Sequence, residues 1–392
     1  NVSMDAATYK TAVGMYSLLS NTGERNTSLG YAALHANGTG YRNTAVGNGA
    51  LYANMEGYRN TAVGTGALNL NQDGNYNTAV GNIALNQNYN GHSNTAVGDG
   101  ALYSNTDGDE NTALGLSALY RNITGNANTA TGRDALYYNT DGNFNTANGY
   151  MALYGNSTGS SNTAMGFRAL ELNQGNGNTA FGNYALNTNT TGHWNTAVGG
   201  YALNGNTEGN TNTALGRNAG SYGDSDFTGS GNIYLGYDVR PASATESDTI
   251  RIGKLQTATY IKGIYSATSS GGVAVYVNSS GKLGTTTSSR RYKEDITDMG
   301  DASSNLMKLR PVAFHYKPEY IDGPRTMQYG LIAEEVAEVY PELVVYDPKT
   351  GQPQTVSYHL VNALLLNEVQ KQQRRINDLE ERLARLESMI GK

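Results

Sequence analysis

A short motif, Asn-Thr-Ala/Ser-X-Gly, recurs at nearly constant spacing through the first 220 residues. The spacing is 17 residues except for one step of 16, and the motif begins at Asn26, Asn43, Asn60, Asn77, Asn94, Asn111, Asn128, Asn145, Asn162, Asn178, Asn195 and Asn212. A degenerate copy starts at Thr11, and the full unit reads N-T-A-V-G-x-x-A-L-x-x-N-x-x-G-x-x. Such a period is typical of a solenoid, in which each repeat stacks on its neighbours.

The composition of the unit favours β-structure. Seventeen residues are too few for a helix pair, and each unit contains two Gly and about three Asn, which are poor helix formers. We therefore predict a β-solenoid whose coils have two short strands, around Thr-Ala-Val and around Ala-Leu, with turns at Gly and Asn. Ala, Val and Leu are expected to stack inward, with ladders of Asn or Thr. About twelve coils at ~4.8 Å would give a rod of roughly 60 Å.

Several variable positions of the repeat hold Tyr, namely Tyr41, Tyr52, Tyr58, Tyr103, Tyr120, Tyr137, Tyr138 and Tyr154. Exposed aromatic rows suit carbohydrate or protein recognition, and packing over the turns is an equally good interpretation. The histidines lack metal-ligand spacing (His35, His92, His193, His315 and His359), and no Cys is present. We therefore expect neither a metal site nor a cofactor.

Charge divides the chain near residue 288. Residues 1–287 carry 13 Lys+Arg and 17 Asp+Glu, whereas the much shorter segment 288–392 carries 14 and 16. The net charge of −6 argues against a nucleic-acid partner, and no apolar run is long enough for membrane insertion. The chain opens at Asn1 without a charged-then-apolar leader, so a signal peptide is expected to be absent or removed.

The repeat region is predicted to span residues 1–222, because the period fails after Gly220. Residues 223–287 read as a β-rich stem with Gly/Ser turns and four short strands, at 232–236, 249–253, 260–264 and 273–277. These strands have little to pack against within one chain, so we expect them to interleave between chains.

Residues 288–392 predict a small α+β domain. We expect a strand at 311–317, a helix at 331–340 that Pro341 ends, and a hairpin of 343–346 with 355–358. A helix over 359–390 follows, with heptad spacing at Leu365, Val369, Gln372, Ile376, Leu379, Leu383, Leu386 and Ile390.

That heptad pattern predicts a parallel coiled coil. With Ile376 at position a, Arg375 and Arg382 fall at g, and Glu380 and Glu387 fall at the following e, as in interchain ion pairs. An amphipathic helix that stays with its own domain is the alternative. Three chains would also bury the thin Ala-rich core better than one, so both regions favour a homotrimer.

Four segments of this domain together resemble the endosialidase-type intramolecular chaperone: Ser-Ser-Arg-Arg-Tyr-Lys-Glu-Asp-Ile at 288–296, Leu-Arg-Pro-Val-Ala-Phe-His-Tyr at 309–316, Tyr-Gly-Leu-Ile-Ala-Glu-Glu-Val at 329–336, and the terminal helix. The resemblance covers 288–392. Such domains end phage tail spikes and fibres and occur in some membrane-bound transcription factors. The resemblance implies a homotrimeric chaperone that assembles the preceding β-fibre and then releases itself. The repeat is similar in style to the β-rolls of trimeric autotransporter adhesin heads, whose coils are shorter.

The resemblance also implies a serine endopeptidase acting once, in cis. Carried over, Ser288 is the nucleophile, Lys293 is its base, and the cut falls between Thr287 and Ser288. A serine hydroxyl needs a neighbouring base, and a lysine serves only where burial or nearby cations lower its pKa. Arg290 and Arg291 are such cations in the sequence.

Two details of the resemblance leave alternatives open. Ser289 is the alternative nucleophile. Some family members have a His just before the Gly-Leu-Ile-Ala stretch, where this chain has Gln328 and Tyr329, so a supporting residue is not identified.

Together these features predict a trimeric fibre of a phage tail or similar particle, present in the virion or at a cell surface, whose partner is a host receptor or glycan. A bacterial surface or secreted adhesin with the same chaperone is the first alternative. An ice-binding solenoid is another, although the Asn and Ala neighbours of the invariant Thr suggest that this Thr is buried. A glycan hydrolase lacks support, since residues 1–222 show few paired carboxylates recurring on one face. We expect no enzyme activity in the repeat.

Overall fold

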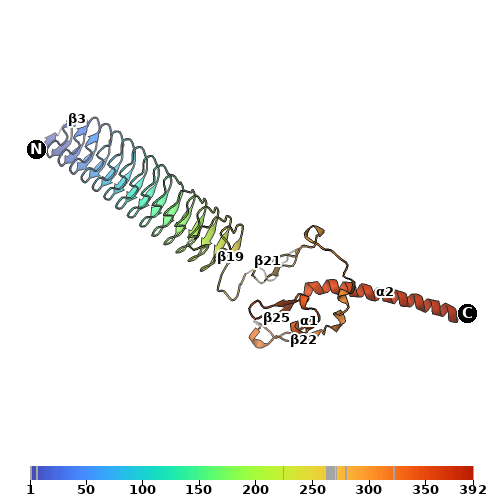
Figure 1. The fold of residues 1–392 in the computed structure, drawn as a ribbon. Helices are drawn as coiled ribbons and strands as arrows, with labels where there is room; N and C mark the ends of the chain where they lie inside the picture. Colours follow the sequence, from blue (N-terminus) through green and yellow to red (C-terminus); the bar gives the residue numbers. More distant parts are fainter. Residues whose placement is uncertain are drawn as a thin grey trace. The chain divides into compact units, whose positions relative to one another are not determined.

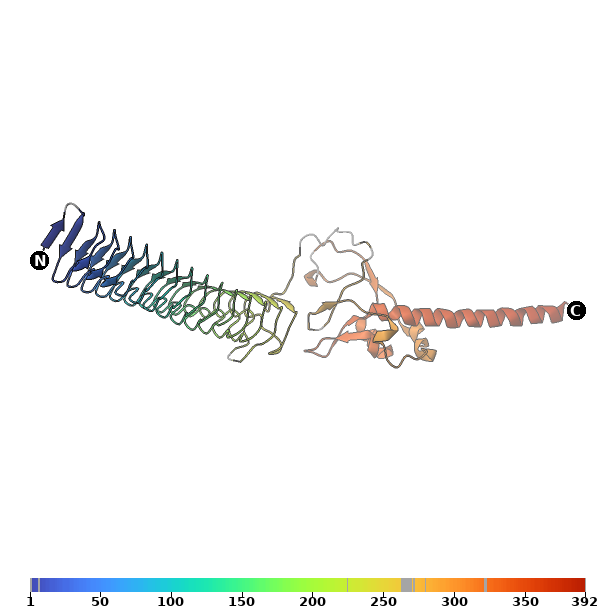
Figure 2. The same ribbon diagram turned by 90° about the horizontal axis from the view of Figure 1, so that it is seen from above.

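The chain forms two compact units, Asn1–Tyr260 and Ile261–Lys392. The computed structural model describes residues 2–5, 8–223, 225–261, 270, 272–278, 280–320 and 323–391 (Figures 1 and 2). The first unit is a β-solenoid of about fourteen turns, which confirms the predicted fold class and exceeds the twelve coils expected. The second unit is small and contains the two α-helices of the described residues.

One long sheet runs the length of the solenoid (Figure 1). Its first strand, β1 (Val2–Asp5), pairs antiparallel with β2 (Lys10–Val13), and all later neighbours are parallel. Each coil contributes one strand: β4 (Thr27–Leu29), β6 (Thr44–Val46), β8 (Thr61–Val63), β9 (Thr78–Val80), β10 (Thr95–Val97), β11 (Thr112–Leu114), β12 (Thr129–Thr131), β13 (Thr146–Asn148), β14 (Thr163–Met165), β15 (Thr179–Phe181), β16 (Thr196–Val198), β17 (Thr213–Leu215), β18 (Ile233–Leu235) and β19 (Ile250–Ile252). A second parallel sheet joins three shorter strands, β3 (Ser20–Asn21), β5 (Ala36–Asn37) and β7 (Ala53–Asn54).

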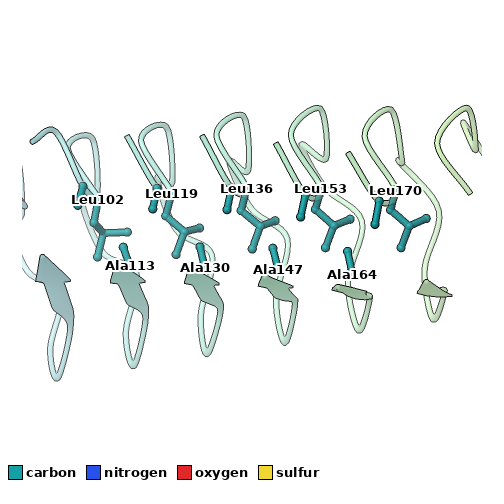
Figure 3. Packing of buried hydrophobic residues seen from close by; sticks show 14 of the residues in the cluster. Leu102, Ala113, Leu119, Ala130, Leu136, Ala147, Leu153, Ala164 and Leu170 are labelled. Atoms are coloured by element: carbon teal, nitrogen blue, oxygen red, sulfur yellow. The ribbon is translucent and has the colours of Figure 1, made fainter. Parts of the chain in front are cut away.

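The apolar core is a stack of Ala and Leu side chains. Figure 3 shows Leu102, Leu119 and Leu136 in a row, facing the strand residues Ala113 and Ala130. All five are fully buried. The expected inward Val is wrong, because successive residues of a strand point to opposite faces and Ala takes the inward one. The invariant Thr also faces outward, so its expected burial is wrong as well: in β10 and β11 the Thr is exposed and the following Ala is buried.

The Ala-Leu segment itself is a turn, and the predicted second strand forms only in three of the described coils, where β3, β5 and β7 begin two residues after the Leu. Leu119 has a φ of 52°, and its N–H donates to the carbonyl of Ala135 in the next coil at 2.9 Å. A left-handed backbone costs roughly 1–2 kcal/mol in a residue that is not glycine. Complete burial of a Leu side chain contributes roughly 1.5–3 kcal/mol, which offsets that cost.

Two columns of buried Asn form the polar half of the core. Asn94 Oδ1 accepts from the backbone N–H of Asn111 in the next coil at 2.9 Å, and Asn94 Nδ2 donates to the carbonyl of Gly108 at 2.7 Å. In the second column Asn105 Nδ2 donates to Asn88 Oδ1 at 2.7 Å and to the same Gly108 carbonyl at 2.9 Å. A Cβ on Gly108 would overlap Asn105 Oδ1, which explains the glycine. The expected Asn ladders are thus confirmed.

A third column lies two residues before the motif in the coils from Asn75 onward, and no role was predicted for it. Its side chains accept the N–H of the same position one coil earlier, so the column holds short acceptors: Asn75, His92, Asp109, Asn126, Asn143, Ser160, Asn176, His193 and Asn210. His92 accepts through Nδ1 from the Asn75 N–H at 3.0 Å, and its own N–H donates to Asp109 Oδ1 at 2.6 Å. The two histidines therefore occupy structural positions.

The solenoid continues beyond residue 222, the position at which the repeat region was predicted to end. β18 and β19, predicted as stem strands at 232–236 and 249–253, extend the sheet in register: β18 pairs with β17, and β19 pairs with β18. At the inward position Ala214 is followed by Tyr234 and then Arg251. Arg251 Nε donates to Glu246 Oε1 at 2.8 Å, and the Tyr234 hydroxyl donates to the same oxygen at 3.2 Å. This ion pair replaces the apolar core at the last strand.

The remaining stem strands differ from expectation in another way. The segment 260–264 lies largely outside the described residues. Within 273–277 only β20 (Tyr276–Val277) forms, and it pairs antiparallel with β21 (Leu283–Gly284). Interleaving between chains stays a prediction.

The C-terminal unit has a small core of its own. It contains the antiparallel pairs β22 (Val312–Phe314) with β23 (Gln328–Gly330) and β24 (Val344–Tyr346) with β25 (Pro353–Val356), the helices α1 (Ala333–Val339) and α2 (Tyr358–Ile390), and the 3-10 turns η1 (Arg290–Tyr292), η2 (Gly300–Ser303), η3 (Leu306–Lys308), η4 (Pro318–Tyr320) and η5 (Pro341–Leu343). The core is formed by Leu306, Val336, Tyr340, Leu343, Val344, Val356 and Leu364. The predicted elements appear in the predicted order. β22, α1 and β24 are shorter than expected, β25 lies two residues earlier, and α2 begins one residue earlier.

α2 leaves its heptad stripe in solvent. Its first half is held by the η2 segment, where Asn367 Nδ2 donates to Ser303 Oγ at 2.8 Å and Lys371 Nζ donates to Asp301 at 2.9 Å. Beyond Lys371 the apolar positions are about half exposed or more, at Ile376, Leu379, Leu383, Leu386 and Ile390. No described helix is long and apolar enough to cross a membrane. The coiled coil stays a prediction.

The Asn columns generate a prediction on stability. Asn94→Ala removes the acceptor of the Asn111 N–H and one donor of the Gly108 carbonyl, so it should lower the free energy of unfolding by about 2–4 kcal/mol. The matched control Asn90→Ala removes one exposed contact to Asp107 and should cost less than about 0.5 kcal/mol. Guanidinium unfolding of the full chain, followed by far-UV circular dichroism, measures both. Equal losses would contradict the buried ladder.

The ion pair at the end of the solenoid generates a second prediction. The Arg251 guanidinium holds the pKa of Glu246 below its ordinary value. A group with a depressed folded pKa stabilises above its unfolded pKa and loses that contribution as pH falls through the folded one. Coils β18 and β19 should therefore open below about pH 4. Hydrogen exchange of residues 233–252, corrected for intrinsic rates, should rise at acid pH. Glu246→Gln should flatten this dependence, and the exposed control Glu208→Gln should leave it unchanged.

Candidate self-cleavage site

The residues expected to carry the chemistry lie on one tight turn. Ser289 is extended (φ −67°, ψ 140°), and η1 follows directly. The Tyr292 N–H donates to the Ser289 carbonyl at 3.0 Å, and the Lys293 N–H donates to the Arg290 carbonyl at 3.1 Å. The turn reverses the chain, so that Lys293 Nζ lies 3.2 Å from Ser288 Oγ.

This contact distinguishes the two candidate serines. Within the described residues Lys293 Nζ bonds to Ser288 Oγ and not to Ser289. Arg290 and Arg291 lie in the same turn, and the Arg291 guanidinium stands over the Tyr292 ring at 4.8 Å. Neither arginine forms an ion pair with any described residue. The turn thus holds three basic residues, and of these Lys293 contacts the Ser288 hydroxyl.

The geometry suits proton transfer, with one condition. In the observed contact Nζ is the donor, whereas a base must accept the hydroxyl proton. That reversal needs surroundings that disfavour an ammonium ion. Ser288, Lys293 and the residues between them are all exposed in the single chain. The single chain therefore brings the candidate pair together, but without surroundings that would disfavour the ammonium form of Lys293.

The residues at the position of the family histidine do not join this pair. Gln328 Nε2 donates to Thr326 Oγ1 at 3.0 Å, and Tyr329 is 83% exposed. Within the described residues neither one bonds to Ser288 or Lys293. Tyr329 lines an open cavity of about 440 Å³ together with Pro311, Val312, Ala313, Gly330 and Leu331. No supporting residue for the Ser-Lys pair is identified there.

Sequence reasoning missed the role of Tyr358 in this region. Its hydroxyl accepts the Leu331 N–H at 3.0 Å, and a Cβ on Gly330 would lie 2.7 Å from that hydroxyl. Gly330 therefore allows the start of α2 to pack on the segment that leads into α1. The glycine of the Tyr-Gly-Leu-Ile-Ala stretch is the only signal in the sequence.

The tyrosines of the solenoid form stacks along it. Tyr103, Tyr120, Tyr137 and Tyr154 stack in order with centroid distances of 5.0, 5.1 and 5.4 Å. Burial, together with the neighbouring Tyr138 hydroxyl, raises the pKa of Tyr154 to about 12. Ring faces that cover one another are not free for stacking on a sugar. The stacks therefore favour packing over the turns.

The comparison with protein families identifies the C-terminal region. A family model described as the chaperone of endosialidase matches residues 288–345, which confirms the resemblance over that range. No curated protein and no solved structure matches the chain. The match begins at Ser288 and includes η1, β22, β23 and α1. It fits a self-cleaving chaperone with a serine-type autoprotease activity, placed after a β-solenoid.

Proposed function

We propose that this chain is a trimeric fibre protein whose C-terminal domain assembles the β-solenoid and then cuts the chain between Thr287 and Ser288. The observation that carries the proposal is the 3.2 Å contact between Lys293 Nζ and Ser288 Oγ, at the residue where the chaperone match begins. The exposed stripe of α2 supports assembly through other copies of the chain.

The reaction needs two bond exchanges. Ser288 Oγ attacks the carbonyl carbon of Thr287, so that a C–O bond forms and the peptide C–N bond breaks. Lys293 Nζ takes the hydroxyl proton and passes it to the released amine of Ser288. Water then hydrolyses the ester, giving the Thr287 carboxylate and restoring the hydroxyl. Because nucleophile and carbonyl belong to adjacent residues, no substrate cleft is required.

In this proposal, trimer assembly supplies the covering of Lys293 that the single chain lacks. Arg375, Glu380 and Glu387 form no ion pair among the described residues, so they are available to neighbouring helices, whereas Arg382 pairs with Asp378 at 3.9 Å. A parallel trimer around α2 brings three C-terminal units together and covers surface that is exposed in one of them. Cleavage is therefore expected only after the trimer forms.

The particle to which such a fibre belongs is, in this proposal, a phage tail or related injection device with a host receptor or surface glycan as partner. A chaperone of endosialidase is typical of phage tail fibres. A bacterial surface adhesin is the second candidate, supported by the likeness of the repeat to adhesin β-rolls. The genes that flank this one distinguish the two.

The Ser-Lys pair generates the sharpest prediction. Wild-type protein should yield fragments of roughly 287 and 105 residues, the smaller beginning at Ser288. Ser288→Ala removes the nucleophile and Lys293→Ala removes its base, so both should leave full-length trimers and slow cleavage by at least about 100-fold. Denaturing electrophoresis and N-terminal sequencing of the small fragment measure this.

Two matched controls accompany these variants. Ser289→Ala changes the adjacent serine, and Lys308→Ala changes an exposed lysine elsewhere in the domain, so both variants should cleave normally. Cleavage should be first order and independent of protein concentration once trimers exist. A small fragment that begins at Ser289 would identify Ser289, and not Ser288, as the nucleophile. Undiminished cleavage in both Ser288→Ala and Lys293→Ala would show that another protease cuts the chain.

The chaperone role generates a separate prediction. A gene truncated after residue 287 should give aggregated or monomeric solenoid, because aligning three chains in register is entropically costly without the C-terminal domain. The uncut Ser288→Ala chain should instead sediment as an elongated trimer in analytical ultracentrifugation. Soluble trimer from the truncated gene would contradict this role.

A further inference from the structure

The long sheet of the solenoid presents one regular face to solvent. It has two columns, formed by the residues on either side of the inward-facing residue of each strand, which is Ala in most coils. The threonine column contains Thr11, Thr27, Thr44, Thr61, Thr78, Thr95, Thr112, Thr129, Thr146, Thr163, Thr179, Thr196, Thr213, Ile233 and Ile250. The valine column contains Val13, Leu29, Val46, Val63, Val80, Val97, Leu114, Thr131, Asn148, Met165, Phe181, Val198, Leu215, Leu235 and Ile252.

This face carries no charge over its whole length. None of the residues in the two columns is ionisable, whereas the turns of the same coils carry Arg42, Glu56, Asp99 and Arg133 among others. Many of its apolar side chains lie in solvent, for example Leu114 at 47% and Leu215 at 53% exposure. Depletion of charge over an exposed apolar strip is typical of the core of a protein interface.

We propose that this outward face packs against the same face of other copies of the chain, side by side, parallel and in register. The inference rests on the proposed trimeric fibre and identifies the surface that joins its solenoids. A second copy is the occupant that best matches the face, because it repeats the same rung spacing over the same number of coils.

The area of the face suits such an interface. Fourteen steps of ~4.8 Å and a three-residue width of ~10 Å give roughly 670 Å² per copy. Two facing copies would bury about 1,300 Å², which reaches the range of stable protein interfaces. A shorter partner, or one of different period, would leave part of the strip exposed.

Substitutions within the valine column favour the parallel register. Thr131 and Asn148 interrupt the apolar column on β12 and β13. In a parallel, in-register pair the amide of Asn148 meets another Asn148 and can exchange hydrogen bonds with it. In an antiparallel pair centred on β12, Asn148 would instead meet Leu114 and lose those bonds. Asn148 thus disfavours the antiparallel arrangement, just as a polar core residue specifies the register of a coiled coil.

The absence of cysteine from the chain allows a direct test. Val97→Cys in the uncut Ser288→Ala background should be cross-linked by a short bis-maleimide into covalent dimers, with up to about two of every three chains joined in a trimer. The matched control Asn90→Cys, at an exposed turn of the preceding coil, should stay monomeric in denaturing gels. In native trimers a bulky maleimide should label Asn90→Cys fully and Val97→Cys at least tenfold more slowly.

A mixed sample tests the orientation. Chains with Val97→Cys and chains with Met165→Cys, co-expressed with tags of different size, should each cross-link to their own kind only, because β10 and β14 lie opposite each other only in the antiparallel arrangement. Cross-links between the two kinds would overturn the parallel register.

Other outcomes separate this inference from the proposed function. A trimer in which Val97→Cys is labelled as fast as Asn90→Cys would leave the fibre intact and overturn the interface. A trimer with such a free face could be tested for lowering the freezing point of the solution. If it did so, and Val63→Lys abolished the effect while Gln72→Lys did not, the face would bind ice instead of another copy. A monomer in analytical ultracentrifugation would contradict the trimeric fibre itself, and with it this inference.

Discussion

The solenoid depends on buried asparagine side chains whose hydrogen-bond partners lie at fixed positions in the same coil and in the adjacent one. A buried amide has two donors and one acceptor oxygen, and leaving them unpaired costs more than the bonds contribute when made. Asn94 and Asn105 meet this demand through Asn111, Asn88 and the Gly108 carbonyl. The arrangement works only when the next coil places the same groups at the same height, so the chemistry of the core enforces the period of the sequence.

The repeat made the fold predictable, but not the direction of every side chain. Spacing and composition sufficed for a β-solenoid with Asn ladders, since both follow from the motif alone. The inward Val failed because a three-residue strand has room for one inward side chain, and Ala113 holds that place while Leu114 faces out. The prediction of a strand at Ala-Leu is wrong because Leu119 adopts a left-handed backbone. Backbone propensity disfavours that conformation in a leucine, and burial of the Leu119 side chain offsets the cost. Neither outcome can be inferred from the 17-residue spacing of the motif alone.

The end of the solenoid was predicted too early, because a coil without the Ala of the motif was not recognised as a coil. Asn232 and Gly236 keep the spacing of the motif, and Asn232 makes the ladder bond to Asn212 Oδ1 at 3.0 Å. Tyr234 in place of Ala hid that coil. The cleavage pair differs, since Ser288 and Lys293 were expected from the family resemblance, and one 3-10 turn is enough to bring them together. Nothing in the described part of the chain covers the pair, since Ser288 and Lys293 are both exposed, so the sequence offered no covering residue to predict.

The two ends of the solenoid differ most from the coils between them. At one end β1 runs antiparallel to β2, and at the other Glu246 and Arg251 replace the apolar core. Most coils between them share the Asn ladders, the buried Ala and Leu and the parallel strand pairing. Seventeen codons can therefore be duplicated or deleted in the middle of the gene without creating a new end. The reach of the molecule is thus a heritable quantity that changes in steps of one coil, and selection can adjust it separately from the machinery that assembles the chain.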